Sequence, residues 1–316
     1  MSKRSWLLSA FMVLILPFMI LSILDKRSED PLLVVQPTAQ QETSYIVRVE
    51  RSTEVQEMEL DKYISSVIYA EMPASFTPEA LKAQAVAIRT YTLRIIDKGS
   101  KHTQAHLCTE SSCCQAFREI DASDAAKRIQ KAVQETKDEV LIYDNELIEA
   151  TYFSCSGGRT ESALEVWGSD VPYLQAQDSP GEEIATHFED TLMLPIDTFR
   201  AKLGLGDNLE ITDITYTDGD GVKNIWIGGA QFTGLEIREK LQLRSTSFSI
   251  LPLEDSVLIT TNGYGHRVGM SQYGAEAMAQ SGSNYKQILS HYYQNTTVRK
   301  VSKEELSGIF DKERKL

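Results

Sequence analysis

The pattern of apolar and polar residues is most informative between residues 59 and 73, which read ELDKYISSVIYAEMP. Apolar side chains recur there at intervals of three and four, which predicts a helix with one buried stripe. The stripe comprises Leu60, Tyr63, Ile64, Val67 and Ile68. Glu71 falls on the same stripe, where a further apolar residue would be expected. Pro73 should end the helix, because proline disfavours the helical conformation of the preceding residue.

A second helix is predicted by FTPEALKAQAVAIRTYTLRIIDKGS, with Thr77 as N-cap, Pro78 at its first position and Gly99 near its end. SYIVRVE and TEVQEMEL predict an antiparallel pair of strands that leads into the first helix. Two hairpins are expected farther on, one around Asp144 and Asn145 and one around the DGDG at 218–221. Strands and helices do not alternate regularly, which favours an α+β fold of mixed helices and antiparallel strands.

The N-terminus contains a long apolar run. Residues 6–24 are uncharged and mostly apolar, close to the roughly 20 residues that span a bilayer. They predict one transmembrane helix, preceded by a cytoplasmic tip at 1–5 that carries Lys3 and Arg4. A cleaved signal peptide is the alternative, but the run is long for one and no A-x-A-like site follows. Residues 25–44 are rich in Pro, Gln and charge, and are expected to form a tether.

Composition excludes two classes of protein. With 42% hydrophobic and 24% charged residues, the chain has the composition of a globular protein rather than a disordered one. Its 32 basic and 45 acidic residues give a formal net charge of -13, whereas nucleic-acid binding requires clustered Lys and Arg. Nucleic acid is therefore not an expected partner.

Glu71 has a setting that suits general acid catalysis. Burial against apolar side chains disfavours a carboxylate anion, and the last turn of a helix places it beside the negative end of the helix dipole. Both effects raise the pKa, so the carboxyl can donate a proton near neutral pH. The alternative is a structural Glu that reaches solvent or pairs with Lys82 or Arg89 of the next helix.

A cluster of soft ligands follows the second helix, in KHTQAHLCTESSCCQAF at 101–117. His102, Cys108 and Cys114 are spaced by six and six, which suits a loop around a soft cation. A disulfide from Cys108 to Cys114 or Cys113 and free thiols are the alternatives. Cys113 and His106 are further candidate ligands.

A glycine-rich segment, GYGHRVGMSQYGA, precedes the C-terminal helices. Glycines at 263, 265 and 269 predict a tight loop that runs into a helix, where backbone can approach a ligand closely. A purely structural turn is the alternative. Gln272 and Tyr273 are candidate sugar contacts, and SCSGG at 154–158 is expected to form a wall of the groove. No Ser-His-Asp order is identifiable.

Four blocks of sequence together resemble one family. YAEMPASFTPEALKAQAVAIRTYTL resembles the signature of the SpoIID/LytB family of cell-wall proteins, the stage II sporulation protein D family. Three further segments resemble other sequence blocks of that family: YFSCSGGRTESALEVWGSDVPYLQAQDSP, FTGLEIREKLQLRSTSFSI and NGYGHRVGMSQYGAEAMAQSGSNYKQILSHYY. The resemblance runs from about residue 45 to about residue 297. It implies an extracytoplasmic catalytic region at 45–300, with two lobes and a cleft that forms the substrate groove, followed by a charged tail at 301–316.

The resemblance also implies an activity. The Glu of A-E-M-P, here Glu71, is the family's catalytic acid of a lytic transglycosylase, which cleaves peptidoglycan glycan strands between MurNAc and GlcNAc and leaves 1,6-anhydro-MurNAc ends. Substrate contacts are then expected from Lys82, Arg89, Tyr152, Ser154, His266, Gln272 and Tyr273. Ordinary glycosidases use two carboxylates, whereas this reaction needs only one. Glu161, Glu165, Asp170 and Asp178 are the other acids of the central block, expected to be solvated loop charges.

The family resemblance extends to the metal. Some members carry H-x5-C-x5-C, whose residues bind zinc beside the active site, which implies one structural zinc per chain on His102, Cys108 and Cys114. One departure is Arg267, which follows His266 where the family usually has glycine, as in G-H-G-V-G-M-S-Q.

Partners and location are likewise implied by the resemblance. Sporulation proteins P, an amidase, and M of the same stage are expected partners, at the mother-cell membrane that faces the septal wall during engulfment. Two other functions remain open. The chain could be a non-catalytic enhancer of a cell-wall amidase, or a zinc-dependent hydrolase, which the absence of H-E-x-x-H disfavours.

Overall fold

The structure is a computed structural model that describes residues 45–52 and 54–312. The predicted tip (1–5), transmembrane anchor (6–24) and tether (25–44) lie outside these residues and stay predictions. Across the described part of the chain, no helix combines the length and the apolar character needed to cross a bilayer.

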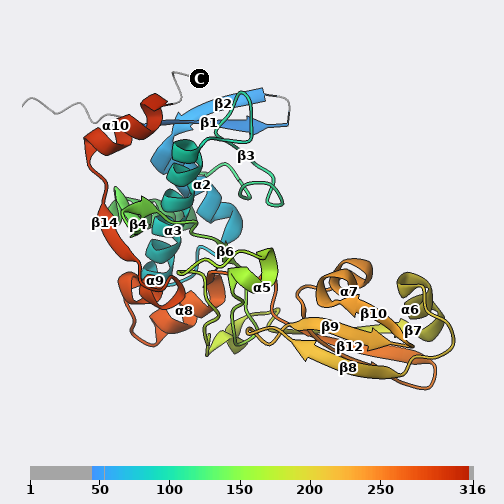
Figure 1. Cartoon of the computed structure of the whole chain (residues 1–316). Helices are drawn as coiled ribbons and strands as arrows, with labels where there is room; N and C mark the ends of the chain where they lie inside the picture. Colours follow the sequence, from blue (N-terminus) through green and yellow to red (C-terminus); the bar gives the residue numbers. More distant parts are fainter. Residues whose placement is uncertain (1–44, 53, 313–316) are drawn as a thin grey trace, which may run out of the picture. The chain divides into compact units, whose positions relative to one another are not determined.

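Figure 1 shows the order of the elements along the chain. The helices are α2 (Leu60–Glu71), α3 (Pro78–Lys98), α4 (Asp124–Glu135), α5 (Ala163–Trp167), η1 (Glu182–Ile184), α6 (Ile196–Leu203), α7 (Gly234–Leu241), α8 (Gln272–Gln280), α9 (Tyr285–Tyr292) and α10 (Lys303–Lys312). The strands are β1 (Ile46–Arg51), β2 (Glu54–Glu59), β3 (Leu107–Cys108), β4 (Glu139–Tyr143), β5 (Glu146–Leu147), β6 (Tyr152–Phe153), β7 (Glu189–Pro195), β8 (Ile211–Tyr216), β9 (Val222–Ile227), β10 (Ala230–Thr233), β11 (Ser247–Pro252), β12 (Ser256–Asn262), β13 (Met270–Ser271) and β14 (Thr297–Lys300).

Most strand pairs are antiparallel, as predicted. The sheets have the orders β10-β9-β8, β11-β12-β7 and β14-β4-β5, all antiparallel. β1 pairs antiparallel with β2, as expected from the sequence, and β3 joins β1 in parallel. β6 and β13 form a second parallel pair. The α+β class is thus confirmed, with two short parallel pairs that the sequence pattern did not indicate.

Turn and helix-cap residues in the sequence correctly predicted two hairpins and the ends of α3. The turn between β4 and β5 is made by Asp144 and Asn145, whose φ values of 52° and 64° fit the left-handed conformation of a tight hairpin. The second predicted hairpin joins β8 and β9 around the DGDG segment. Thr77, Pro78 and Gly99 bound α3 as expected, although the Thr77 hydroxyl caps no helix amide and instead donates to Glu276 of α8 at 2.8 Å.

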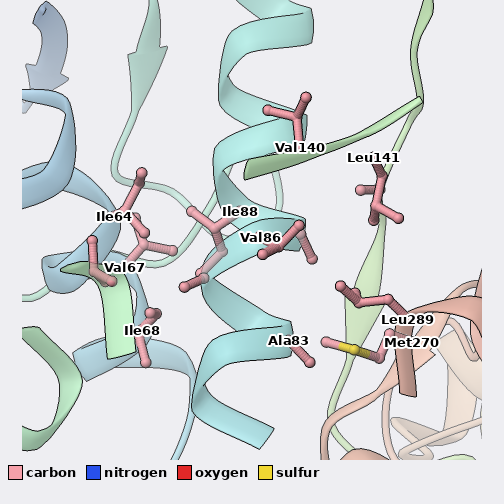
Figure 2. Packing of buried hydrophobic residues seen from close by; sticks show 14 of the residues in the cluster. Ile64, Val67, Ile68, Ala83, Val86, Ile88, Val140, Leu141, Met270 and Leu289 are labelled. Carbon is pink, nitrogen blue, oxygen red and sulfur yellow. The ribbon is translucent and has the colours of Figure 1, made fainter. Parts of the chain in front are cut away.

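The larger hydrophobic cluster is built around α3. Figure 2 shows side chains of α2, α3, β4, α9 and β13 meeting there. The labelled residues are Ile64, Val67, Ile68, Ala83, Val86, Ile88, Val140, Leu141, Met270 and Leu289. Ile64, Val67 and Ile68 are fully buried, which confirms the apolar stripe of α2. Because that stripe packs against α3, the end of α2, with Glu71, is fixed in position.

A second cluster packs within the segment between residues 192 and 259. α6 and α7 contribute Phe199 and Ile237, and β12 contributes Val257 and Ile259, all fully buried. The chain therefore has two separate cores in its described part.

The C-terminal segment corrects an expectation. Residues 301–316 were predicted to be a charged tail, yet the described part of them forms α10, in which Leu306 is 2% exposed. The ring of Phe310 stacks on Tyr45 with centroids 5.3 Å apart. Three apolar positions, Leu306, Ile309 and Phe310, pack against the larger cluster, so the charged residues around them occupy the other face of a docked helix.

Candidate active site

Glu71 lies on the wall of a cavity of about 640 Å³. The same wall includes four predicted substrate contacts, Tyr152, Ser154, His266 and Gln272, and the predicted metal ligand Cys114. Further lining residues were not predicted from the sequence, among them Gln115, Ala116, Arg238 and Tyr264. Of the described residues that line this cavity, Glu71 is the only carboxylic acid. The arrangement therefore offers one acid for proton transfer, and no second carboxylate across a bound sugar.

The Glu71 carboxyl is held by the backbone of a distant loop. It is the last residue of α2, is partly buried, and its Oε1 accepts the Ala116 N–H at 2.9 Å. Burial raises the pKa of Glu71, and the Ala116 hydrogen bond acts in the opposite direction with a smaller effect. The negative end of the α2 dipole also favours the protonated form. Glu71 thus has the environment of a general acid.

Tyr152 is positioned by a buried amide. Gln115 donates from Nε2 to the Tyr152 hydroxyl at 2.8 Å, and its Oε1 accepts hydrogen bonds from Tyr63 at 3.1 Å and Thr92 at 3.3 Å. Burial, and secondly the nearby Glu71 carboxylate, raise the pKa of Tyr152 far above its usual value. Tyr152 therefore remains a neutral phenol beside Glu71, able to donate a hydrogen bond.

His266 is a neutral imidazole on the wall of this cavity. Burial lowers its pKa to about 4. Its Nδ1 accepts the Val268 N–H at 3.1 Å, which assigns the ring hydrogen to Nε2 and to the hydrogen bond with the Tyr152 backbone. The rings of Phe153 and Trp167 contact the imidazole, with centroids 5.6 and 5.4 Å away.

The side-chain amide of Gln272 has a hydrogen-bond donor that no described residue accepts. Its side chain is 3% exposed, and its Nε2 has no partner among the described residues, although buried amides are normally hydrogen-bonded. Since Gln272 lines the cavity, a ligand hydroxyl or carbonyl would satisfy it. Tyr273, the next residue, lies off the wall: it packs edge-on against Phe76, with ring centroids 5.1 Å apart.

The structure does not bring Lys82 and Arg89 to the cavity. Lys82 forms ion pairs with Glu79 at 2.9 Å and Glu135 at 2.8 Å. Arg89 is 1% exposed and donates to carbonyl oxygens at the end of α4, including Thr136 at 2.7 Å. These carbonyls carry the negative end of the α4 dipole, and the Asp61 carboxylate lies 3.5 Å from Arg89 Nη2, so the buried guanidinium has compensating negative charge. Neither residue pairs with Glu71, and neither is placed to contact a ligand of this cavity.

The glycine loop lies close to the strand that carries Tyr152. Gly265 and Gly269 have φ values of 119° and 85°, and a Cβ at Gly269 would lie 2.2 Å from the Thr151 carbonyl oxygen. Only glycine permits this approach. The predicted tight loop is confirmed, and it sets His266 beside β6.

Three thiols and an imidazole gather on the loop that also supplies Gln115 and Ala116. One ligand atom from each of His102, Cys108, Cys113 and Cys114 lies within 4.8 Å of the others. His102 Nε2 is 3.3 Å from Cys114 Sγ and 3.6 Å from Cys113 Sγ, and the two sulfur atoms are 3.9 Å apart. A tetrahedral zinc with sulfurs at ~2.3 Å holds them roughly 3.8 Å apart, so these positions fit zinc.

Other contacts of the histidines and cysteines are also compatible with a zinc site. His102 Nδ1 lies 2.9 Å from Glu50 Oε2, the carboxylate contact typical of a metal-bound histidine. The cysteines are free thiols, so the disulfide alternative is absent from the structure. His106, the other candidate, instead accepts the Arg48 N–H at 3.1 Å through Nδ1. The three predicted ligands are thus brought together with Cys113 as the fourth.

Comparison with known proteins decides the family. A family model described as stage II sporulation protein, SpoIID, matches residues 48–143. Stage II sporulation protein D of Bacillus amyloliquefaciens is 36% identical over 258 residues, which cover 77% of this chain and 75% of that protein. The chain belongs to the SpoIID family. The protein of the same name from Bacillus subtilis (strain 168) gives the same identity and coverage. The amidase enhancer of that strain is 31% identical over 293 residues, covering 74% of this chain and 40% of that protein.

Arg267, at a position where the family resemblance leads us to expect glycine, is buried and links two loops. Its φ of 64° is left-handed, which explains why glycine suits the position. The side chain is 1% exposed and contacts Glu161 Oε1 at 3.1 Å. It also donates to the carbonyl oxygens of Ser156, Arg159 and Gly219. Arg267 therefore joins the SCSGG loop to the turn between β8 and β9.

Glu161 corrects another expectation. It was predicted to be a solvated loop charge, but it is fully buried, and its carboxylate also accepts from Thr217 at 2.7 Å. The other candidate second acids lie off the cavity wall: Glu165 pairs with Lys223 at 2.8 Å, Asp178 pairs with Arg159, and Asp170 accepts from Gln175 at 3.4 Å.

Replacing Arg267 by glycine should destabilise this SpoIID-family protein. Arg267→Gly relieves about 1 kcal/mol of backbone strain but leaves Glu161 buried without its counter-charge, so we expect a net loss of about 2–4 kcal/mol. Urea unfolding measures the change. Adding Glu161→Gln should recover part of the loss, because the buried charge is then removed. Unchanged stability in Arg267→Gly would contradict the structural role of the contacts that Arg267 makes.

Proposed function

We propose that this SpoIID-family protein is a lytic transglycosylase that degrades septal peptidoglycan during engulfment. The single observation that carries the proposal is Glu71, the one acid among the described residues lining the 640 Å³ cavity, with its pKa raised by burial. A cavity of this size suits a small ligand or a short stretch of a polymer. One acid of raised pKa is what a transglycosylase needs, whereas an ordinary glycosidase needs two carboxylates.

The proposed reaction uses Glu71 twice. The protonated carboxyl donates its proton to the glycosidic oxygen between MurNAc and GlcNAc, the C1–O bond breaks, and positive charge develops on the MurNAc ring. The Glu71 carboxylate then accepts the proton of the MurNAc 6-hydroxyl as that oxygen bonds to C1. The products are a 1,6-anhydro-MurNAc end and a free GlcNAc 4-hydroxyl, and Glu71 is again protonated.

Three side chains are proposed to orient the sugar. Tyr152 and, through Nε2, Gln272 are donors on the same wall as Glu71, and the His266 imidazole lines that wall while its own hydrogen bonds go to the backbone. Each is neutral, so none would hold Glu71 in its ionised form. Hydroxyl and acetamido oxygens of the glycan are suitable acceptors.

We also propose that His102, Cys108, Cys113 and Cys114 hold one zinc ion in a structural role. A closed four-ligand site of this kind supplies folding free energy rather than an activated water. The loop it would hold continues directly into Gln115 and Ala116, which bind Tyr152 and Glu71. Metal binding is thereby linked to the geometry of the acid, and Cys114 itself lines the Glu71 cavity.

Location and partners follow from the predicted anchor and the family. The segment 6–24 is proposed to hold the protein at the mother-cell membrane, with the region from residue 45 onward facing the septal wall. Sporulation proteins P and M of the same stage are the proposed partners, with P supplying the amidase activity that removes stem peptides.

An amidase enhancer is the second candidate, since a protein of that name is among the relatives. The two functions differ in whether this protein cleaves glycan alone. We expect the purified chain to shorten peptide-free glycan strands with no amidase present, as measured by size-exclusion chromatography of the strands. Shortening that appeared only when an amidase was added would favour the enhancer.

A further inference from the structure

A second cavity adjoins the Glu71 cavity. It has a volume of about 630 Å³ and is lined by residues of β7, α7 and the segment after α7. Arg238 and Tyr264 line both cavities, so they form a shared wall. Each volume lies in the range of ligand sites, roughly 300–1,000 Å³. If a polymer binds at Glu71, the units next to the bound one can therefore occupy the second cavity, on the other side of Arg238.

Arg238 is the cation of this wall that forms no ion pair within the described part of the chain. Arg244, which also lines the second cavity, is paired with Asp190 at 2.6 Å. Arg238 is partly buried, and its one hydrogen bond among the described residues runs from Nε to the Leu243 carbonyl at a long 3.4 Å. It forms no ion pair with a described residue, although Glu239 and Tyr264 lie near it. Both terminal nitrogens of the guanidinium thus remain available to a ligand.

The lining of the Glu71 cavity is a second reason to expect that Arg238 binds an anionic ligand. Of the described residues that line it, Arg238 is the only one with a permanent positive charge, because His266 is neutral. The hydrogen bonds of Glu71 and Arg238 within the described residues go to Ala116 and Leu243, so the two side chains are not partners of one another. A guanidinium in this position matches a carboxylate, which it can bind through two parallel hydrogen bonds.

We propose that Arg238 is a specificity-determining residue that binds a carboxylate of the glycan strand, with the strand extending from the Glu71 cavity into the second cavity. The inference rests on the proposed function, because it takes its ligand to be peptidoglycan. MurNAc carries a lactyl group whose carboxylate is free on strands without stem peptides and is an amide on strands with them. A stem peptide carries carboxylates of its own. Either source presents the same chemistry to Arg238.

Binding to strands of known carboxylate content tests this proposal. The full-length chain carries Glu71→Gln so that strands are not consumed, and affinity is measured by calorimetry for peptide-free strands and for the same strands with their carboxylates converted to methylamides. Arg238→Gln should weaken binding of the carboxylate strands by about tenfold to hundredfold and leave the methylamide strands unaffected. Arg238→Lys keeps the charge and should lose less.

Lys240→Gln is the matched control. Lys240 is exposed on the same helix and lines neither cavity, so its loss changes the net charge equally without removing the contact. It should bind both kinds of strand as the parent does. Equal affinity of the parent and Arg238→Gln for carboxylate strands, or an equal loss for both kinds of strand, would overturn the proposal.

Strands that bear stem peptides identify the carboxylate. If the lactyl carboxylate is the ligand, they should bind more weakly than peptide-free strands, and Arg238→Gln should remove the difference. Tighter binding of peptide-bearing strands that is lost in Arg238→Gln would assign a stem-peptide carboxylate. Because these are binding measurements on an inactivated chain, they are informative even if the active chain proves not to cleave glycan.

Discussion

Glu71→Gln should abolish glycan cleavage while leaving the protein folded. The amide keeps the shape of the side chain and can still accept the Ala116 N–H, but it has no acidic proton to donate. Loss of a general acid typically lowers the rate by ~10²- to 10⁴-fold, and here the same group also acts as the base. Activity is measured by the release of soluble fragments from purified glycan strands.

The stability of the variant separates a catalytic role from a structural one. Because burial raises the folded-state pKa of Glu71, its stabilising contribution is full at low pH and is lost as pH rises through that raised pKa. Glu71→Gln should therefore be at least as stable as the parent at pH 7. For the same reason, cleavage by the parent should fall as pH rises through a value above the usual Glu pKa.

Asp121→Asn is a suitable control for this experiment. Asp121 is an exposed carboxylate that accepts a hydrogen bond from Tyr69, two residues before Glu71, and it lies outside the cavity. It should retain activity. Full activity in Glu71→Gln would return Glu71 to the structural interpretation.

Cys108→Ser should remove zinc and lower thermal stability. We expect the purified chain to contain one zinc per molecule by elemental analysis and the variant to lose most of it. A ligand bound only to the folded state at a thousandfold excess over its Kd stabilises by about 4 kcal/mol. At roughly 2–4 °C per kcal/mol, Tm should fall by about 10 °C. Cleavage should also decrease, because the loop that holds Ala116 against Glu71 is released.

Cys155→Ser tests whether the effect belongs to the four-ligand cluster. Cys155 is buried outside the cluster, and its thiol donates to Glu182 at 3.2 Å, a bond that a serine hydroxyl can replace. This variant should keep its zinc. A purified chain that contained no metal and had a disulfide between Cys108 and Cys114 would contradict the metal site.

Sequence periodicity predicted the position of Glu71 on the buried stripe of α2 because that information is local, whereas its catalytic role came from the family resemblance and stays a prediction. The stripe of α2 repeats within one helix, and the position of the acid at its end follows from the same spacing. Its partner, the Ala116 amide, lies on a loop 45 residues later, and no local pattern indicates which amide of a loop will point at a carboxylate. The cysteine spacing likewise predicted a cluster, while the inclusion of Cys113 depended on how the loop folds.

Contacts between residues far apart in the sequence explain where the structure differs from the other predictions. Arg89 was a candidate ion-pair partner of Glu71 because it lies on the next helix, but carbonyl oxygens at the end of α4 bind it instead. Glu161 appeared to be a loop charge because its partner, Arg267, is 106 residues away. Arg238 resembled any charge on an amphipathic helix, and only the two cavities set it apart.

The mass of the product ends tests the central claim most directly. Peptide-free glycan strands are digested with the parent chain alone, and the fragments are examined by mass spectrometry. A single acid that closes the ring on C1 predicts fragments ending in 1,6-anhydro-MurNAc, each lighter by one water than a hydrolysed fragment of the same length. Fragments with ordinary reducing MurNAc ends would contradict the account, because they require an attacking water and a second carboxylate to activate it.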